Sequence, residues 1–308
     1  MNDSGSKGIS YTAGFFMAIC FTIAGTFLAS MLAVSIWPLL TGRGMSSFAE
    51  DMLNPAYSGS AKIIQSIMAV VGFLLPAFTT AAMLNRQPAR LMGFTPAQGT
   101  VKQLGLVIGI MLLGLAVSGS LGYLSHQLPL PSSWVNYFTT LETKYNQQVA
   151  GIIGLNSFSD YLFSLVVMAF LPALCEEALF RGVFQNFLSR STRNPWLAII
   201  VVSLIFSVVH LSGFGFLSRL FLGIALGAIY HYTGRLWLAV LAHFINNAIA
   251  LTVLYYYKTS GKDLGAALNE TEGSYWGLLA IPAVIILIML LQKARPDQPK
   301  QQSDLFDF

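Results

Sequence analysis

Charged residues are scarce along this chain. Only 10% of the 308 residues are Asp, Glu, Lys or Arg, whereas a soluble domain carries about 25%. Hydrophobic residues make up 55% of the chain, and the mean hydropathy is +0.65. These values exclude an ordinary soluble protein. The net charge of +4 is better explained by basic loop residues that orient membrane helices than by nucleic-acid binding.

Cysteine and the common catalytic motifs are also rare or missing. The two cysteines, Cys20 and Cys175, both lie inside apolar runs. We expect no disulfide, and we expect Cys175 to be a small packing residue rather than a thiol nucleophile. The sequence has no HExxH pair, no CxxC pair and no Gly-rich phosphate loop. It therefore lacks the marks of an HExxH metalloprotease, a dithiol redox site and a nucleotide-binding site.

Long apolar segments are what the chain has in abundance. Each is near the ~20 residues that a helix needs to cross a bilayer. The sequence therefore predicts an all-α, polytopic membrane protein in which residues 1–308 form a single integral membrane domain. About eight transmembrane helices are expected, at 12–40, 62–84, 101–125, 157–188, 195–211, 214–232, 235–257 and 274–292.

Four further features follow from this reading. The apolar stretch from Tyr11 to Leu40 is too long for a signal peptide and is predicted to be the first membrane helix. Pro172 is expected to kink the fourth helix. The aromatic segment 126–156 is interpreted as a loop that lies on the membrane surface, with a cap over a cavity as the alternative. Residues 293–308 are predicted to form a polar cytoplasmic tail.

Basic residues predict the orientation in the membrane. Ten Lys and Arg residues fall on the side of the N-terminus, and five fall on the other side. Because cytoplasmic loops carry an excess of Lys and Arg, both termini are predicted to be cytoplasmic. The ten are Lys7, Arg86, Arg90, Lys102, Arg190, Arg193, Arg235, Lys293, Arg295 and Lys300, and the five are Arg43, Lys62, Lys144, Lys258 and Lys262.

The fourth predicted helix carries Glu176, Glu177 and Arg181 within an apolar run. A charged group at membrane depth costs at least ~2.5 kcal/mol, so such groups are expected to face one another, water or a substrate. Residues four apart share a helix face, which pairs Glu177 with Arg181. Adjacent residues diverge by about 100°, so Glu176 faces elsewhere and is free to act as a general base.

Two histidines and an asparagine join this set. His210 ends the fifth helix, and His243 shares a face of the seventh with Asn247. Either histidine alone is typical of a helix-packing hydrogen bond, and a Glu–Arg pair alone is typical of a structural brace. Their joint occurrence with a free carboxylate indicates a catalytic site. Gly223 and Gly227 have a small-xxx-small spacing, which tight helix packing explains.

At these residues the sequence resembles the CPBP (Abi) family, the type II CAAX prenyl endopeptidases and their bacterial relatives linked to bacteriocin processing and self-immunity. The family motifs are EExxxR, FxxxH and HxxxN, in that order. Here they are Glu176, Glu177 and Arg181, then Phe206 and His210, then His243 and Asn247. The resemblance covers about 157–257, which is the predicted catalytic core.

The resemblance implies an intramembrane endopeptidase of eight helices with a conical cavity open to membrane and cytosol. It further implies that Glu176 and His210 activate a water and that His243 and Asn247 stabilise the oxyanion. Glu177, Arg181 and Phe206 would support the site. No cofactor is favoured. The alternative is a zinc protease with Glu176, His210 and His243 as the ligands, which the nearby Arg181 would oppose.

The expected partners are a peptide or protein substrate in or at the membrane and the lipid bilayer, without nucleic acid. The expected location is a prokaryotic inner or plasma membrane, where peptide maturation or immunity is favoured over prenylated CAAX substrates. Two other classes remain as alternatives. One is a non-enzymatic membrane scaffold or immunity protein that keeps the fold. The other is a proton-coupled transporter that uses the carboxylate and histidines as a relay.

Overall fold

A computed structural model describes residues 5–95, 101–261 and 273–294. Within these residues the chain forms helices and no strand. Six helical stretches in the described part are long and apolar enough to cross a membrane. They are Tyr11–Thr41, Pro55–Leu84, Val101–Gln127, Phe158–Thr192, Leu236–Thr259 and Trp276–Lys293. Each falls on one of the predicted spans, so the all-α polytopic membrane fold is confirmed.

The other two predicted spans form a shorter helical hairpin. Helix α11 (Pro195–Val209) has 15 residues and α12 (Phe216–Thr233) has 18. At 1.5 Å per residue, α11 is about 22 Å long, which is less than the ~30 Å hydrocarbon core. The hairpin tip, residues 210–215, therefore lies below the surface that the longer helices reach. The prediction of eight full spans stays a prediction.

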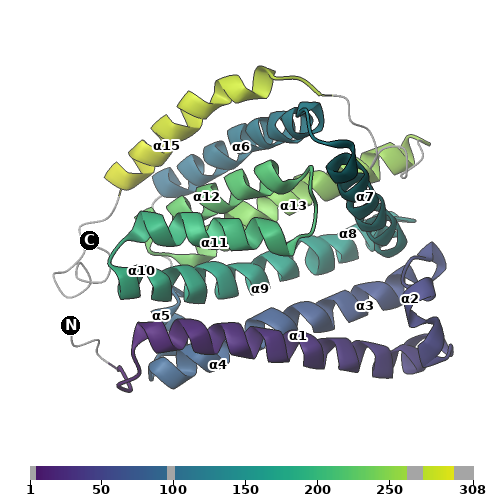
Figure 1. The fold of residues 1–308 in the computed structure, drawn as a ribbon, viewed down its shortest axis with the longest axis horizontal. Coiled ribbons are helices and arrows are strands. Elements are labelled where there is room, and N and C mark those ends of the chain that lie inside the picture. The colour runs from purple at the N-terminus through teal and green to yellow at the C-terminus, as the bar shows by residue number, and fades with distance from the viewer. Residues whose placement is uncertain (1–4, 96–100, 262–272, 295–308) are drawn as a thin grey trace.

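The helices are arranged in layers (Figure 1). Helix α1 (Tyr11–Thr41) lies beside α3 (Ser58–Ala69) and α4 (Leu75–Leu84), which the π-helical η3 (Val70–Leu74) joins. On the opposite side, α6 (Val101–Gln127) packs against α15 (Ile281–Lys293) and the preceding η6 (Trp276–Ala280). The hairpin and α13 (Leu236–Thr259) lie between these layers. The short elements are η1 (Met45–Ser47), α2 (Phe48–Asp51), η2 (Pro55–Tyr57) and α5 (Pro88–Leu91).

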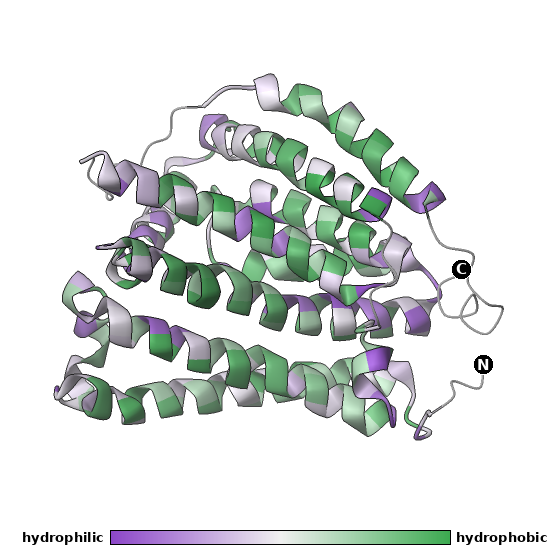
Figure 2. Cartoon of the chain, turned by 180° about the vertical axis from the view of Figure 1, so that it is seen from behind, coloured by the Kyte–Doolittle hydropathy of each residue, from purple (hydrophilic) through white to green (hydrophobic). Residues whose placement is uncertain are grey.

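Hydrophobic residues run along most of the length of the outer helices (Figure 2). On α1, the large side chains of Phe16, Ile23, Phe27 and Met31 are all exposed. A soluble protein rarely leaves such a contiguous apolar surface uncovered, whereas a bilayer covers it. These helices therefore present a surface suited to lipid.

The fourth span is composite, as Pro172 led us to expect. It consists of α8 (Phe158–Ser164), η4 (Leu165–Phe170), α9 (Leu171–Leu179), η5 (Phe180–Gln185) and α10 (Asn186–Thr192), of which η4 and η5 are π-helical. Pro172 lies in the first turn of α9, directly after the wider π-helical turns of η4. Proline has no backbone N–H, so it interrupts the hydrogen bonding of the helix at this point. Both cysteines are free, and Cys175 is buried in α9.

The prediction of a loop at 126–156 was wrong, because most of this segment is the helix α7 (Ser132–Ile153). Trp134, Phe138, Leu141 and Tyr145 recur at the three- and four-residue spacing of one helix face, which marks an amphipathic helix. Helix α7 crosses the end of the bundle near the hairpin tip (Figure 1). The Phe138 ring meets the Phe214 ring at a centroid distance of 5.7 Å. One face of α7 thus contacts the hairpin tip, while Trp134 and Tyr137 stay exposed.

Polar contacts identify which helix ends lie at the same end of the bundle. At one end, the Lys7 N–H donates to the Leu84 carbonyl, and the Gln103 amide donates to the Ala294 carbonyl. The start of the first span and the end of the last span therefore lie at the same end. At the other end, Lys62 forms an ion pair with Asp160. The hairpin tip and α7 lie toward this second end.

Candidate active site

Glu177 and Arg181 form a buried ion pair. The Arg181 Nη1 donates to Glu177 Oε1 over 2.9 Å, one helical turn apart, and both side chains are buried. This is the pairing predicted from helical spacing. The same guanidinium donates from Nη2 to the Gly223 carbonyl over 3.2 Å, and it lies 4.8 Å from the centre of the Phe206 ring. An arginine at this depth is thus held by an anion, a carbonyl and an aromatic face.

The contact to α12 is repeated one turn further along, where the Gln185 amide donates to the Gly227 carbonyl over 2.9 Å. A Cβ at Gly223 would lie 2.9 Å from Ser203 Cβ, so the glycine permits the close approach of α12. Tight helix packing was expected for Gly223 and Gly227. The hydrogen bonds that their carbonyl oxygens accept from Arg181 and Gln185 were not predicted. The available signal was the four-residue series of Glu177, Arg181 and Gln185, which places three polar side chains on one face.

His243 of α13 binds the same carboxylate as Arg181. Its Nδ1 lies 2.8 Å from Glu177 Oε1, and the imidazole is buried. Sequence reasoning missed this contact and assigned Glu177 to Arg181 alone. Because a carboxylate accepts, Nδ1 carries a hydrogen and the Nε2 atom is turned toward the remaining side chains. Glu177 therefore orients a histidine as well as neutralising an arginine.

His210 follows the last turn of α11, and Phe206 orients it in two ways. The His210 Nδ1 lies 2.6 Å from the Phe206 carbonyl oxygen, which fixes the hydrogen on Nδ1. The two rings are also in contact, with centroids 4.6 Å apart. Immediately afterwards, Leu211 has a φ of 50°, a left-handed conformation that is uncommon for leucine. The chain thus turns sharply just past the histidine and leaves its Nε2 facing inward.

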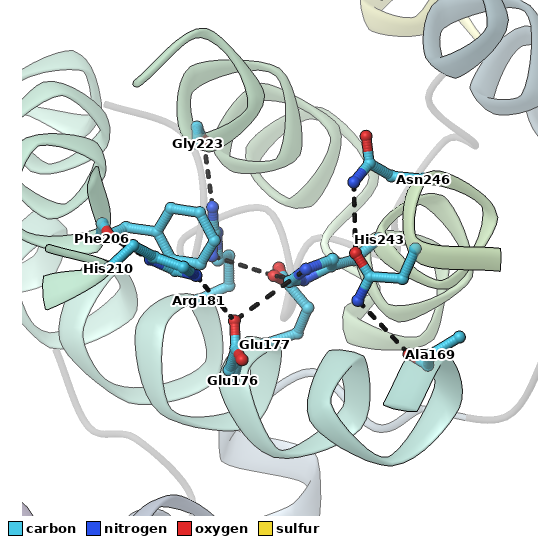
Figure 3. Close-up of polar contacts among 10 residues, drawn as sticks. Ala169, Glu176, Glu177, Arg181, Phe206, His210, Gly223, His243 and Asn246 are labelled. Atoms are coloured by element: carbon cyan, nitrogen blue, oxygen red, sulfur yellow. Dashed lines mark hydrogen bonds and ion pairs between the residues drawn. The ribbon is translucent and has the colours of Figure 1, made fainter. Parts of the chain in front are cut away.

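Glu176 lies between the two imidazoles (Figure 3). Its Oε2 is 4.0 Å from His210 Nε2 and 3.9 Å from His243 Nε2. Both distances are too long for a hydrogen bond, and Oε2 is buried with no hydrogen-bond partner among the described residues. Glu176 makes no ion pair with Arg181, as predicted. The Glu176 carboxylate therefore faces the Nε2 atoms of both His210 and His243.

Asn247 lies one helical turn after His243 on α13, and its side chain bonds to other groups. Its Nδ2 donates to the Ala169 carbonyl over 3.5 Å, and its Oδ1 accepts from Asn246 over 3.2 Å. In the described part of the chain, its side chain makes no hydrogen bond to His243 or Glu176. The oxyanion role expected of His243 and Asn247 stays a prediction. The bond to Ala169 is at the limit of length, so releasing it costs little.

The three side chains of the zinc alternative can be compared with a zinc shell. Among the residues that the structure describes, no group of three or more His, Cys, Asp and Glu is arranged to hold a metal ion. Tetrahedral zinc with ligands at ~2.0 Å has neighbouring donor atoms about 3.3 Å apart. The Glu176 oxygen is 3.9 and 4.0 Å from the two imidazole nitrogens. Without movement of Glu176, His210 and His243, the set does not fit zinc.

The fold and site define a class: an all-α membrane protein with a Glu–His cluster buried among its central helices. The family model described as "Type II CAAX prenyl endopeptidase Rce1-like" matches residues 158–249, just under a third of the chain. All the motif residues lie inside this segment, and the match confirms the resemblance predicted from them. At the level of the family, it supports a CAAX-type intramembrane protease. No curated protein and no solved structure gives a significant match.

Proposed function

We propose that this protein is an intramembrane endopeptidase that hydrolyses a peptide bond in a membrane-embedded or lipid-proximal peptide. The observation that carries this proposal is the position of the Glu176 Oε2 atom, 3.9–4.0 Å from two imidazole nitrogens. A water about 2.8 Å from Glu176 Oε2 can also lie within hydrogen-bond distance of either imidazole nitrogen. Peptide hydrolysis needs such a water, held by a base.

The position of His243 supports a role at the oxyanion. Its Nδ1 lies 2.8 Å from Glu177 Oε1, and its Nε2 faces Glu176 Oε2 at 3.9 Å. The proposal assigns the oxyanion to His243 through an N–H at Nε2.

The reaction follows from these positions. Glu176 takes one proton from the water, whose oxygen attacks the carbonyl carbon of the scissile bond. The oxyanion accepts hydrogen bonds from His243 Nε2 and, after it leaves the Ala169 carbonyl, from the Asn247 amide. Glu176 then returns the proton to the leaving nitrogen, and the C–N bond breaks. His210 accepts the second hydrogen of the water and orients it.

Hydrolysis in ¹⁸O-labelled water tests this function. The purified protein is incubated with peptides from host membranes, and products are identified by mass spectrometry. We expect new C-terminal carboxyl groups that each carry one ¹⁸O atom, formed equally with and without a metal chelator. Activity that a chelator abolishes and zinc restores would establish the metal-dependent alternative. A scaffold gives no products, and a transporter gives proton uptake into liposomes without products.

A substitution at Asn247 tests the oxyanion step. We expect Asn247→Ala to lower turnover by roughly a hundredfold, as for other oxyanion donors, with folded yield near wild type. Asn246→Ala is the matched control, because Asn246 donates only to Asn247 among the described contacts. Single-turnover rates and melting curves are the measurements. If turnover is unchanged in Asn247→Ala, the residue serves helix packing and His243 holds the oxyanion alone.

The proposed orientation places both termini in the cytoplasm of a prokaryotic cell, on the basis of ten against five basic residues. Helix α7 and the hairpin tip then lie toward the extracytoplasmic end of the bundle. A cavity open to the cytosol, which the resemblance implies, would need the opposite orientation or a second opening. Reporters fused to the C-terminal tail and inserted near Lys144 should report opposite sides, with the tail reporter cytoplasmic. A tail reporter outside the cell would overturn this topology.

A further inference from the structure

Arg219 is a second cation within the apolar helices, and the catalytic cluster does not use it. It lies in the first turn of α12, at the hairpin tip. Arg219 and Thr233 are 14 positions apart in α12, about 21 Å, against a hydrocarbon core of ~30 Å. If Thr233 lies at one membrane surface, Arg219 lies several ångströms below the other. A guanidinium at this depth needs an anion, water or an aromatic face.

The groups around Arg219 leave it without an anionic partner. Its guanidinium lies 5.2 Å from the centre of the Tyr145 ring of α7. The Arg219 side chain also lies against the hairpin tip, since a Cβ built at Gly215 would clash with Arg219 Nη1. In the described part of the chain, no carboxylate lies within ion-pair distance of it. Glu142 of α7 instead accepts a hydrogen bond from Ser212 over 2.9 Å. The side chain is half-buried, so a ligand can reach it.

The position of Arg219 connects it to the reaction. The tip that begins at His210 ends one turn before Arg219, and the Ser207 hydroxyl ties the two arms together through the Phe216 carbonyl over 2.6 Å. The groups that act electrostatically on His210 are Glu176, Arg219 and His243. Arg219 therefore lies on the α7 side of the site, where its guanidinium faces the Tyr145 ring.

We infer that Arg219 binds a carboxylate of the substrate peptide and so selects peptides that present one close to the scissile bond. This inference rests on the proposed function. A guanidinium binds a carboxylate through two parallel hydrogen bonds, which gives both affinity and direction. The carboxylate has two possible sources, an acidic side chain or the chain terminus. When no carboxylate is bound, the Tyr145 ring holds the Arg219 guanidinium in place.

Binding of synthetic peptides tests this inference. The probe is a fluorescent, Leu/Ala-rich dodecapeptide in four forms: a free C-terminal carboxylate, a C-terminal amide, and the amide with one internal Glu or Gln. Each is titrated in detergent against full-length Glu176→Gln protein, which is not expected to cleave it. We expect at least one carboxylate form to bind about tenfold to a hundredfold more tightly than its neutral counterpart. Whichever form shows the preference identifies the source.

Variants at position 219 provide the controls. Arg219→Gln should remove the preference, and Arg219→Lys should keep part of it. Lys144→Gln removes an exposed cation from the same end of the molecule and should leave the preference unchanged. Equal binding of all four forms overturns the inference, as does a preference that survives Arg219→Gln. Loss of binding to anionic lipid vesicles in Arg219→Gln, without a peptide preference in the parent protein, assigns the site to a lipid headgroup and also overturns it.

The cleavage assay separates this inference from the proposed function. With Glu176 intact, cleavage that ignores peptide charge leaves the protease function standing and removes the role of Arg219. A charge preference in binding without any cleavage supports the role of Arg219 and counts against the protease function. Melting curves of each variant show whether Arg219 is instead needed for folding, and in that case the binding preference of Arg219→Lys decides. A folded Arg219→Lys protein with no preference overturns the inference.

Discussion

Glu176→Gln should abolish peptide hydrolysis while leaving the folded yield and melting temperature near wild type. Glutamine keeps the size and an oxygen acceptor of the side chain but cannot take a proton from water. A positioned general base contributes about a hundredfold to ten-thousandfold, so the remaining rate should fall at least that far. Stability should hold because Glu176 Oε2 has no hydrogen-bond partner to lose among the described residues. Cleavage rates and melting curves in one detergent measure both effects.

The matched control is Glu50→Gln, which makes the same chemical change at an exposed carboxylate of α2. It should change neither the cleavage rate nor the melting temperature. Two results would count against the assigned role. Cleavage at the wild-type rate in Glu176→Gln would mean that one of the histidines is the base. A large drop in melting temperature would mean that the carboxylate braces the helices.

The pairing of Glu177 with Arg181 could be predicted from the sequence, because it depends only on local geometry. A four-residue spacing pairs Glu177 with Arg181, and a one-residue shift turns Glu176 away. The structure has this pair at 2.9 Å. The apolar run lengths likewise predicted the six long spans, since length and hydropathy are properties of each segment by itself.

Local helical geometry does not predict contacts between segments that are far apart in the sequence. The Glu177–His243 bond joins residues 66 positions apart, and the Arg181–Gly223 bond joins residues 42 apart. No periodicity within one helix indicates which face of another it meets. Helix α7 was missed for a different reason. Its aromatic residues were interpreted as part of a loop on the membrane surface, although their spacing is that of one helix face. The apolar residues of the α11–α12 hairpin predict two further spans, and the structure adds that both helices are short.

Glu177→Ala should destabilise the protein, in contrast to Glu176→Gln. Removing Glu177 leaves the buried Arg181 guanidinium without its anion, and breaking such a pair costs ~3–5 kcal/mol. The variant should express poorly or melt early. Activity should fall for two reasons, since His243 also loses the oxygen that holds its Nδ1 at 2.8 Å. Melting temperature, folded yield and cleavage rate should be measured together.

The double variant Glu177→Gln with Arg181→Met separates these two effects. It removes both buried charges, so part of the stability lost in Glu177→Ala should return. The glutamine oxygen can still accept from His243 Nδ1, but the negative charge that faces this imidazole is gone. Cleavage should therefore stay well below wild type even where the melting temperature recovers. No substitution at Arg181 should rescue Glu176→Gln. If Glu177→Ala is stable but inactive and Glu176→Gln melts early, the two glutamates have the opposite roles.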